Sequence, residues 1–481
     1  MFPTLLKSRS VTLLLWLVVL NIGTFVPAQP TTSPLQPNII VIFTDDQGYN
    51  DIGAYGSPLI RTPRLDQMAS EGLRFTDFYV AAPVCSASRA SLLTGRYPDR
   101  HGTGGVYWPG DKGLDPQEVT LANVLGEAGY ATACFGKWHL GDVPGSLPTS
   151  RGFSTYWGIP YSNDMFIGPT QPFAADAVFR DGKDLASAQT DQQFVTANLA
   201  DRASLIKSGL KERVPLMRDH EIVEYPADQS TLTRRYFDHT IAFVDQARAQ
   251  QKPFFIYLAP AMPHVPLFAS DDFAGKSPRG LYGDTIEEID AHVGRLLDHL
   301  DRAGLSENTL VVFTSDNGPW LSKGEDAGSA APFRDGKFTA YEGGVRVPAI
   351  MRWLGHIPDG SESNEIAATI DLLPTLAHIA GATLPAAALD GVDLSEHIKA
   401  PHTPVTREAY YYFVSGKPVA IRSGNWKYLP HSAARNADKT SPPELYDLGV
   451  DSGEQFNLIA TQFDRARALS RQLAQFATRP K

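Results

Sequence analysis

Two apolar, β-branched runs each end in acidic and amide residues, and this repeated arrangement constrains the fold more than any other feature. Residues 38–43 precede Thr-Asp-Asp-Gln-Gly, and residues 309–314 precede Ser-Asp-Asn-Gly. Continuous runs of this kind are typical of strands buried on both faces of a parallel sheet. A third run, residues 253–258, has the same character. Ligands of such sheets bind beyond the carboxyl ends of the strands, where both acidic runs are expected.

The pattern between these strands predicts an α/β fold. Residues 120–129 and 285–304 have apolar side chains at helical spacing, and buried strands alternating with amphipathic helices indicate a mostly parallel sheet. Residues 174–218 are more polar and are predicted to form a surface excursion beside the site. We expect a main domain over residues 37–400 and a smaller subdomain over residues 401–481.

The smaller subdomain is predicted from short β-rich segments followed by one amphipathic helix. The helix carries apolar residues at steps of three and four from Phe463 to Phe476. Turns containing Gly separate the strands, which favours an antiparallel sheet. The expected strands are residues 410–413, 418–422, 426–429 and 444–448.

Charge and cysteine content exclude two classes of protein. The 481 residues contain 43 Lys and Arg against 53 Asp and Glu, a net charge of −10, whereas nucleic-acid-binding proteins usually have a basic face. Only two Cys occur, Cys85 and Cys134, so a disulfide framework is not expected.

Residues 1–28 are predicted to be a cleaved signal peptide. Lys7 and Arg9 precede an apolar segment at residues 11–20, and Val-Pro-Ala at residues 26–28 places small residues at a cleavage site before Gln29. A membrane anchor is the alternative, but the apolar segment is about half the length that a bilayer requires. We therefore expect an exported protein with no membrane span after cleavage.

The acidic runs are candidates for a metal site. Asp45, Asp46, Asp316 and Asn317 offer oxygen ligands, which suit Ca²⁺ or Mg²⁺ better than Zn²⁺. Either run alone would more simply be a turn or a helix cap. Because both follow buried strands, and adjacent carboxylates repel unless a cation is present, the pair together favours a metal.

Three further groups of residues are candidates for catalysis. Lys137 and His139, at i and i+2 of an expected extended segment, would point to one face, where a cation and an imidazole suit an anionic substrate. A solvated edge strand is the alternative. His264 lies among prolines and could be functional or a buried structural histidine. Cys85 and Arg89 have helical spacing in a Ser-rich segment, although a lone Cys is more often a core residue.

Several motifs occur in the order found in one enzyme family. They are residues 37–48, 85–96, 136–141, 158–164, 314–318, 336–348 and 444–448. In these motifs, which span essentially the whole mature chain, the protein resembles the type I, formylglycine-dependent sulfatases, and within them the arylsulfatase A group. The resemblance implies an alkaline-phosphatase-like α/β/α sandwich with a C-terminal antiparallel sheet. It also implies hydrolysis of an aryl or carbohydrate sulfate ester.

The resemblance implies a role for each site residue. Cys85 would be converted to Cα-formylglycine, whose hydrate is the nucleophile. Arg89 would hold that hydrate, His139 would take up its proton, and His264 would act on the leaving alcohol. Sulfate oxygens would be bound by Lys137, Lys337 and, as a weaker candidate, Ser162. The implied Ca²⁺ ligands, with Mg²⁺ as the alternative ion, are Asp45, Asp46, modified Cys85, Asp316 and Asn317.

One departure from the family pattern concerns maturation. The common motif has Pro two residues after Cys, where this chain has Ala87. In the family, the Ala form is accepted by radical-type formylglycine maturases, which favours a bacterial protein that is periplasmic or secreted. The substrate we expect is a small sulfated molecule, most simply a sulfated glycan fragment. The alternatives are a phosphodiesterase or phosphatase of the same superfamily and a homologue that binds sulfated glycans without maturation of Cys85.

Overall fold

Strand β1 (Asn38–Thr44) is completely buried at the centre of a mixed, 11-stranded sheet. It lies parallel to β10 (Thr309–Ser315) on one side and to β9 (Phe254–Ala259) on the other. The computed structural model describes residues 1, 3–4, 36–433 and 440–480. The three apolar runs of the sequence therefore form adjacent parallel strands, as predicted.

The remaining strands extend the sheet on both sides. Beyond β9 come β4 (Ala131–Gly136) and β5 (Thr155–Gly158), which run parallel to β9. An antiparallel pair of strands and the edge strand complete this half of the sheet, and fewer strands lie on the opposite side of β1. The full order is β12 (Ser361–Ser363), β2 (Leu73–Phe75), β11 (Ala349–Arg352), β10, β1, β9, β4 (Ala131–Gly136), β5 (Thr155–Gly158), β7 (Leu216–Arg218), β8 (Glu221–Tyr225) and β6 (Phe173–Phe179).

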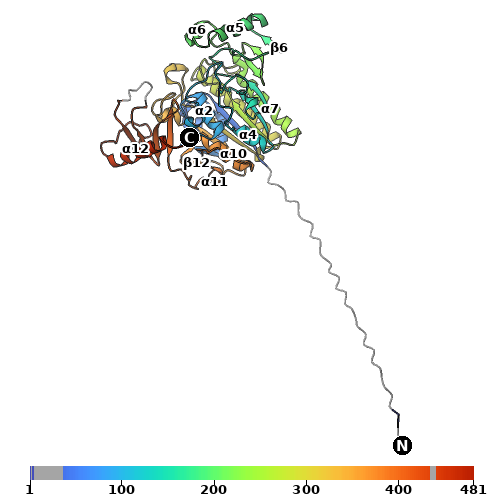
Figure 1. The fold of residues 1–481 in the computed structure, drawn as a ribbon, viewed down its shortest axis with the longest axis vertical. Coiled ribbons are helices and arrows are strands. Elements are labelled where there is room, and N and C mark those ends of the chain that lie inside the picture. The colour runs from blue at the N-terminus through green and yellow to red at the C-terminus, as the bar shows by residue number, and fades with distance from the viewer. Residues whose placement is uncertain (2, 5–35, 434–439, 481) are drawn as a thin grey trace. The chain divides into compact units, whose positions relative to one another are not determined.

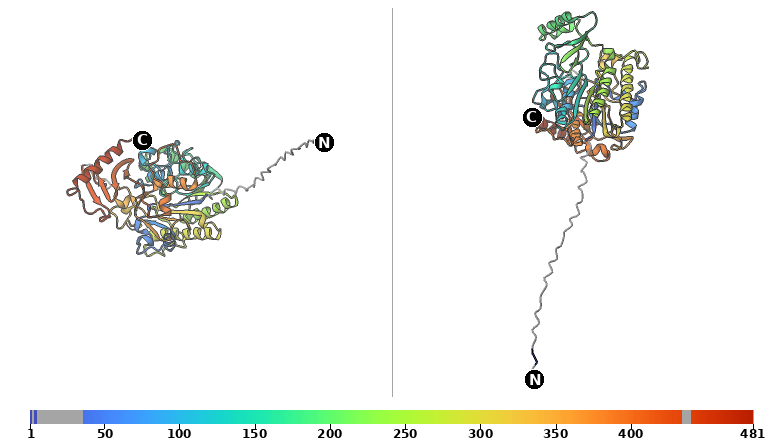
Figure 2. Two further views of the ribbon diagram at one scale, coloured as in Figure 1. Left: turned by 90° about the horizontal axis from the view of Figure 1, so that it is seen from below. Right: turned by 90° about the vertical axis from the view of Figure 1, so that its right-hand side faces the viewer.

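Helices cover both faces of this sheet (Figure 2). Alternate residues of β1 enter two separate cores: Ile39, Val41 and Phe43 pack in one, and Ile40 and Ile42 in the other. The first core includes side chains of α2 (Cys85–Thr94), α4 (Leu121–Glu127) and α10 (Leu372–Ala380). The second includes those of α1 (Pro63–Ser70), α7 (Leu232–Ala249) and α8 (Leu281–Arg302). This alternation explains why the strand has no polar face.

The C-terminal segment forms the predicted separate antiparallel sheet. Its four strands are β14 (Tyr410–Val414), β15 (Lys417–Ser423), β16 (Trp426–Leu429) and β17 (Glu444–Asp447), paired in chain order. The amphipathic helix α12 (Phe463–Ala477) packs on this sheet through Ala466, Leu469 and Leu473 (Figure 1). The fold class is confirmed, whereas the boundary at residue 400 stays a prediction.

The polar segment at residues 174–218 contains more regular structure than its sequence indicates. It includes most of β6, all of β7 and the helices α5 (Leu185–Ala197) and α6 (Arg202–Lys207), which lie together at one end of the sheet (Figure 1). Only Ala188, Asp191 and Val195 of α5 are buried, so the helix has little apolar periodicity.

Short elements complete the chain. They are η1 (Tyr49–Asp51), η2 (Gly53–Tyr55), β3 (Phe78–Tyr79), α3 (Pro98–His101), η3 (Pro148–Ser150), η4 (Gln229–Thr231), η5 (Ser306–Asn308), η6 (Leu321–Asp326), α9 (Glu342–Val345), β13 (Ala367–Ala368), η7 (Thr369–Asp371) and α11 (Ser395–Lys399). Within the described residues, no helix combines the length and apolar character needed to cross a membrane. The predicted signal peptide falls outside the described residues except at positions 1, 3 and 4.

Candidate active site

The acidic residues that follow β1 and β10 meet at the carboxyl edge of the sheet. The parallel register places Thr44 opposite Ser315, so the loops after the two strands lie side by side. The backbone N–H of Asp46 donates to Asp316 Oδ1 at 3.1 Å, and Asn317 Nδ2 donates to Asp46 Oδ1 at 2.7 Å. The two runs that the sequence singled out are therefore in direct contact.

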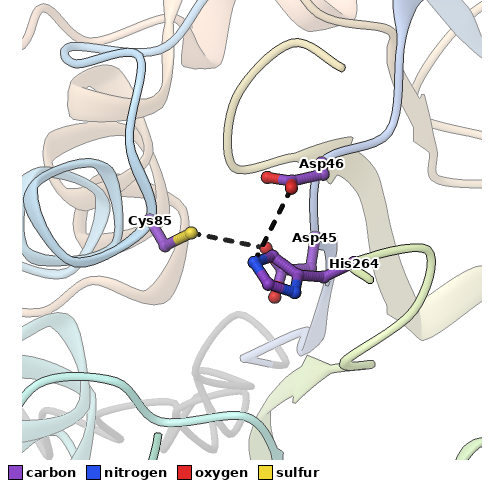
Figure 3. Close-up of side chains that lie close together, drawn as sticks. All are labelled: Asp45, Asp46, Cys85 and His264. Carbon is purple, nitrogen blue, oxygen red and sulfur yellow. Dashed lines mark hydrogen bonds and ion pairs between the residues drawn. The ribbon is translucent and has the colours of Figure 1, made fainter. Parts of the chain in front are cut away.

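This group has the ligands that a hard divalent cation requires. Asp46 Oδ2 and Asn317 Oδ1 are buried and have no hydrogen-bond partner among the described residues. Buried oxygens of this kind normally have a partner, so the pair indicates a missing ligand. Atoms of Asp45, Asp46, Cys85 and His264 lie within 4.8 Å of one another (Figure 3). Since carboxylate and amide oxygens suit Ca²⁺ and Mg²⁺, the residues present fit such an ion.

Cys85 is the first residue of α2 and points into this group (Figure 3). Its Sγ lies 3.5 Å from Asp45 Oδ1 and 3.3 Å from the Nζ of Lys337. Burial, together with the charge of Asp45, raises the pKa of the thiol far above its ordinary value. A thiolate is the reactive form of cysteine, so an unmodified Cys85 would be a poor nucleophile here.

Arg89 lies one helical turn after Cys85, as its spacing predicted, and is completely buried. Its Nε and Nη2 donate to Asp316 Oδ2 at 3.0 and 2.8 Å, and its Nη1 donates to the carbonyl of Lys137 at 3.1 Å. Burial raises the pKa of Asp316 to about 7, against the opposing charge of Arg89. Arg89 thus orients a candidate metal ligand and the segment that carries Lys137.

Two lysines contact the aspartates of the first acidic run. The Nζ of Lys137 donates to Asp45 and lies 3.3 Å from Ser162 Oγ, whereas the Nζ of Lys337 donates to Asp46 Oδ1 at 2.5 Å. Burial alone would raise the pKa of Asp45, but the positive charges around this carboxylate, with Lys137 the largest, together outweigh burial and hold the pKa well below its ordinary value.

The charges of the site balance. Three buried carboxylates face three buried cations, so a bound divalent ion would leave the group positive and suited to an anionic substrate. The residues concerned are Asp45, Asp46 and Asp316 with Arg89, Lys137 and Lys337.

His139 differs from its expected conformation. Strand β4 ends at Gly136, and His139 has a left-handed backbone with φ of 60°, so residues 137–139 do not continue as an extended strand. Its Nε2 lies 3.2 Å from the carbonyl of Tyr107, which can only accept, so Nε2 carries the proton. The buried Nδ1 has no partner among the described residues and is free to accept a proton. Asp46 shares the left-handed conformation, which is uncommon outside glycine and recurs at functional sites.

His264 follows β9 and is held by its neighbours. Its Nδ1 lies 3.0 Å from Asn163 Oδ1, Ser162 Oγ lies 3.3 Å from the ring, and its Nε2 lies 3.8 Å from Asp46 Oδ2. Burial and then the charge of Lys337 lower the pKa of His264 well below its ordinary value, so the ring is neutral near pH 7.

The structure brings the eleven site residues named from the sequence to one edge of the sheet, after β1, β4, β5, β9 and β10, in the first turns of α2 and in the segment before α9. Their catalytic and ligand roles stay predictions. Sequence reasoning missed two contacts, the Tyr107 carbonyl and the Asn163 side chain. Asn163 follows Ser162 in a quoted motif and could have been found there, whereas a backbone carbonyl has no sequence signal.

The chain is similar to known sulfatases along most of its length. The family model described as Sulfatase matches residues 37–382, and the model described as N-sulphoglucosamine sulphohydrolase, C-terminal, matches residues 333–478. Arylsulfatase A of Homo sapiens is 40% identical over 446 residues, which cover 88% of this chain and 83% of the relative. N-acetylgalactosamine-6-sulfatase of Rattus norvegicus is 34% identical over 483 residues, which cover 91% and 84%.

Solved structures show the same likeness in three dimensions. The crystal structure of Ps i-CgsB in complex with k-i-k-neocarrahexaose has a TM-score of 0.75 at 30% identity, over 92% of this chain and 93% of that one. The crystal structure of the PsFucS1 sulfatase from Pseudoalteromonas sp. has a TM-score of 0.76 at 28% identity, over 92% and 90%.

Proposed function

The chain belongs to the sulfatase family and is a sulfuric ester hydrolase, and we propose that its nucleophile is Cys85 after conversion to Cα-formylglycine. The observation that carries this proposal is the position of the Cys85 side chain, 3.5 Å from Asp45 and 3.3 Å from Lys337. The side chain is 2% exposed in a group of charges suited to an anion, but its raised pKa makes the thiol itself unreactive.

A formylglycine hydrate supplies what neither a thiol nor a serine can. One hydroxyl oxygen of the hydrate would attack sulfur, the S–O bond to the alcohol would break, and the sulfuryl group would be left on the side chain; the proton lost by the attacking hydroxyl is balanced by the one that the alcohol gains. Loss of the proton from the second hydroxyl would then break the C–O bond, release sulfate and restore the aldehyde. A serine would be left as a stable sulfate ester. We assign uptake of the second proton to the Nδ1 of His139, which accepts no hydrogen bond from any residue that the structure describes.

We propose Asp45, Asp46, residue 85, Asp316 and Asn317 as the metal ligands, with Ca²⁺ as the ion and Mg²⁺ as the alternative. When bound, such an ion supplies positive charge to the sulfuryl oxygens and to the hydrate. Asp46 Oδ2 and Asn317 Oδ1, which lack a hydrogen-bond partner in the described part of the chain, support this assignment.

Lys137, Lys337 and Ser162 are proposed to bind the sulfate. The two lysines are buried and are each held by an aspartate, so they require no reorganisation when charge develops on sulfate oxygens. Ser162 can accept from Lys137 and contacts His264, which links the sulfate site to the leaving-group side.

His264 is proposed to give a proton to the leaving alcohol. Because its ring is neutral near pH 7, it must gain a proton as the anionic substrate enters, or donate the proton that one ring nitrogen already carries. Asn163 and Ser162 fix the orientation of the ring for either route.

The substrate class that we propose is a sulfated carbohydrate fragment, with activated aryl sulfates as artificial substrates. The relatives named for N-acetylgalactosamine 6-sulfate and the structure holding a neocarrahexaose support this class. Turnover of 4-nitrophenyl sulfate and a panel of monosaccharide sulfates tests it. A protein that cleaves 4-nitrophenyl phosphate faster than the sulfate would instead be a phosphatase, and one that binds but never turns over sulfated sugars would be a binding homologue.

We propose that the protein is exported and that Cys85 is matured by a radical-type enzyme. The charged and apolar segments within residues 7–20 support export, and Ala87 supports that class of maturase. N-terminal sequencing of the exported protein should begin at Gln29. Co-expression with a radical-type maturase should raise the formylglycine content, and an unchanged content would contradict the assignment.

A further inference from the structure

Trp320 lies at the edge of the site, three residues after Asn317, and the mechanism above gives it no role. Its ring centroid lies 5.8 Å from that of His264, and the Nζ of Lys337 lies 4.9 Å from its ring centre. Trp320 therefore touches both the group proposed to act on the leaving alcohol and one proposed to hold sulfate. A substrate bound between these two groups would have its alcohol part beside the indole.

The loop that carries Trp320 is tied to the rest of the site. The carbonyl of Pro319 accepts the backbone N–H of Lys337 at 2.9 Å, and the N–H of Gly318 donates to the carbonyl of Gly344 at 3.0 Å. Phe338 packs edge-on against the indole at 5.5 Å and has a φ of 75°, which is unusual for a bulky residue. The indole is thus held in place before any substrate arrives, as a binding surface requires.

The indole retains one unused polar group. Its Nε1–H is buried and has no hydrogen-bond partner among the described residues, although Trp320 as a whole is only partly buried. A buried tryptophan N–H usually has a partner, and leaving one without a partner is unfavourable. An oxygen of a bound substrate beside His264 would satisfy this group.

We propose that Trp320 forms the wall of the subsite for the alcohol part of the substrate and favours a sugar. The ring would pack on the sugar, and Nε1–H would donate to one of its hydroxyl or ring oxygens. This inference rests on the proposed function, which supplies the substrate class. It adds Trp320 as a residue that determines specificity and takes part in no catalytic step.

The test compares two sulfates with similar leaving groups but different polar atoms. One is the monosaccharide sulfate that the parent enzyme cleaves fastest. The other is cyclohexylmethyl sulfate if the sulfate ester of that sugar is on a primary carbon, or cyclohexyl sulfate if the ester is on a secondary carbon. In Trp320→Phe the ring remains but the N–H is lost, so kcat/KM should fall by roughly three- to tenfold for the sugar and by less than about twofold for the cycloalkyl sulfate.

A binding measurement separates contact from positioning. The desulfated sugar, used as a competitive inhibitor, should bind more weakly to Trp320→Phe by a similar factor. If Trp320 only positioned His264 or Lys337, the affinity for the desulfated sugar would be the same in the variant and the parent. Trp426→Phe is the matched control, because Trp426 is also partly buried with a cation, Arg465, over its ring at 4.2 Å. Its kcat/KM for both sulfates and its affinity for the desulfated sugar should match those of the parent.

Three results would overturn the inference: equal losses on both sulfates, no loss on either, or a parent that cleaves 4-nitrophenyl sulfate but no monosaccharide sulfate. A parent that cleaves none of these compounds would instead contradict the proposed function itself.

Discussion

The Nζ of Lys337 lies 3.3 Å from the Sγ of Cys85, although the two residues are 252 positions apart in the chain. The same Nζ donates to Asp46 at 2.5 Å, so one buried cation joins the nucleophile precursor to a candidate metal ligand. This arrangement places positive charge where a sulfuryl group would be attacked.

Replacing either site lysine should impair catalysis without unfolding the protein. Lys337→Ala and Lys137→Ala should each lower kcat/KM for 4-nitrophenyl sulfate by roughly ten- to a thousandfold, as expected for loss of one charge contact in the transition state. Steady-state kinetics on matured protein measure this. Lys399→Ala, an exposed lysine on α11, should change kcat/KM by less than about twofold. Equal effects in all three variants would contradict the assignment.

The metal should be lost together with activity when an aspartate of the site is removed. Asp46→Ala removes a carboxylate whose Oδ2 has no hydrogen-bond partner among the described residues, so metal content and kcat should fall in parallel. Elemental analysis of the purified protein gives the occupancy. Asp290→Asn, in α8, should keep the ion, because the carboxylate of Asp290 accepts from the N–H groups of Arg64 and Leu65 at the start of α1 and lies outside the group of candidate ligands. Active parent protein without stoichiometric Ca²⁺ or Mg²⁺ would refute the site.

The effect of removing His264 should depend on the leaving group. His264→Ala should reduce turnover of sugar sulfates far more than that of 4-nitrophenyl sulfate, because a nitrophenolate departs without protonation and a sugar alkoxide does not. A series of aryl sulfates with increasing leaving-group pKa would show the loss growing along the series. If the loss is uniform, His264 binds sulfate or orients the substrate and is not the proton donor.

The overall plan of the fold was predictable because it depends on local patterns. Residues 39–43 and 310–313 are apolar at every position, which only a doubly covered strand accommodates, and the acidic runs after these strands had to lie at one sheet edge. The left-handed backbone of His139 was not predictable, since the spacing of Lys137 and His139 fits an extended segment equally well. Its conformation depends on packing after β4 ends.

Long-range polar contacts were also beyond sequence reasoning. Lys427 of β16 is completely buried and contacts Glu342 Oε1 at 2.9 Å and Glu454 Oε1 at 2.8 Å, which joins the C-terminal sheet to the helix that follows Lys337. Lys427 and Glu454 lie in no quoted motif, and although Glu342 lies in the motif of residues 336–348, the charges of all three alone would have placed them at the surface.

This buried group should make stability depend on pH. Burial raises the pKa of Glu454 to about 7, against the charge of Lys427, from an unfolded value of 4.5. The folded state therefore binds this proton more tightly, so ionisation of Glu454 reduces the free energy of unfolding as pH rises from 4.5 to 7. Glu454→Gln should lack this contribution. Urea unfolding at pH 5 and pH 8 should show the parent losing stability relative to the variant at the higher pH.

Glu444→Gln serves as the control for that measurement, because Glu444 contacts Tyr341 and Tyr446 but not Lys427. Its stability relative to the parent should be similar at both pH values. A parent that gains stability relative to Glu454→Gln between pH 5 and pH 8 would show that the salt bridge to Lys427 outweighs the cost of burial.

The mass of the tryptic peptide of residues 75–89, measured on fully active enzyme, tests the central claim most directly. Conversion of Cys85 to formylglycine replaces CH₂SH by CHO, so the peptide should be lighter by about 18 Da, and activity should scale with the converted fraction across preparations. Cys85→Ala should be folded and inactive. Full activity from protein in which the peptide retains an unmodified thiol would contradict the account.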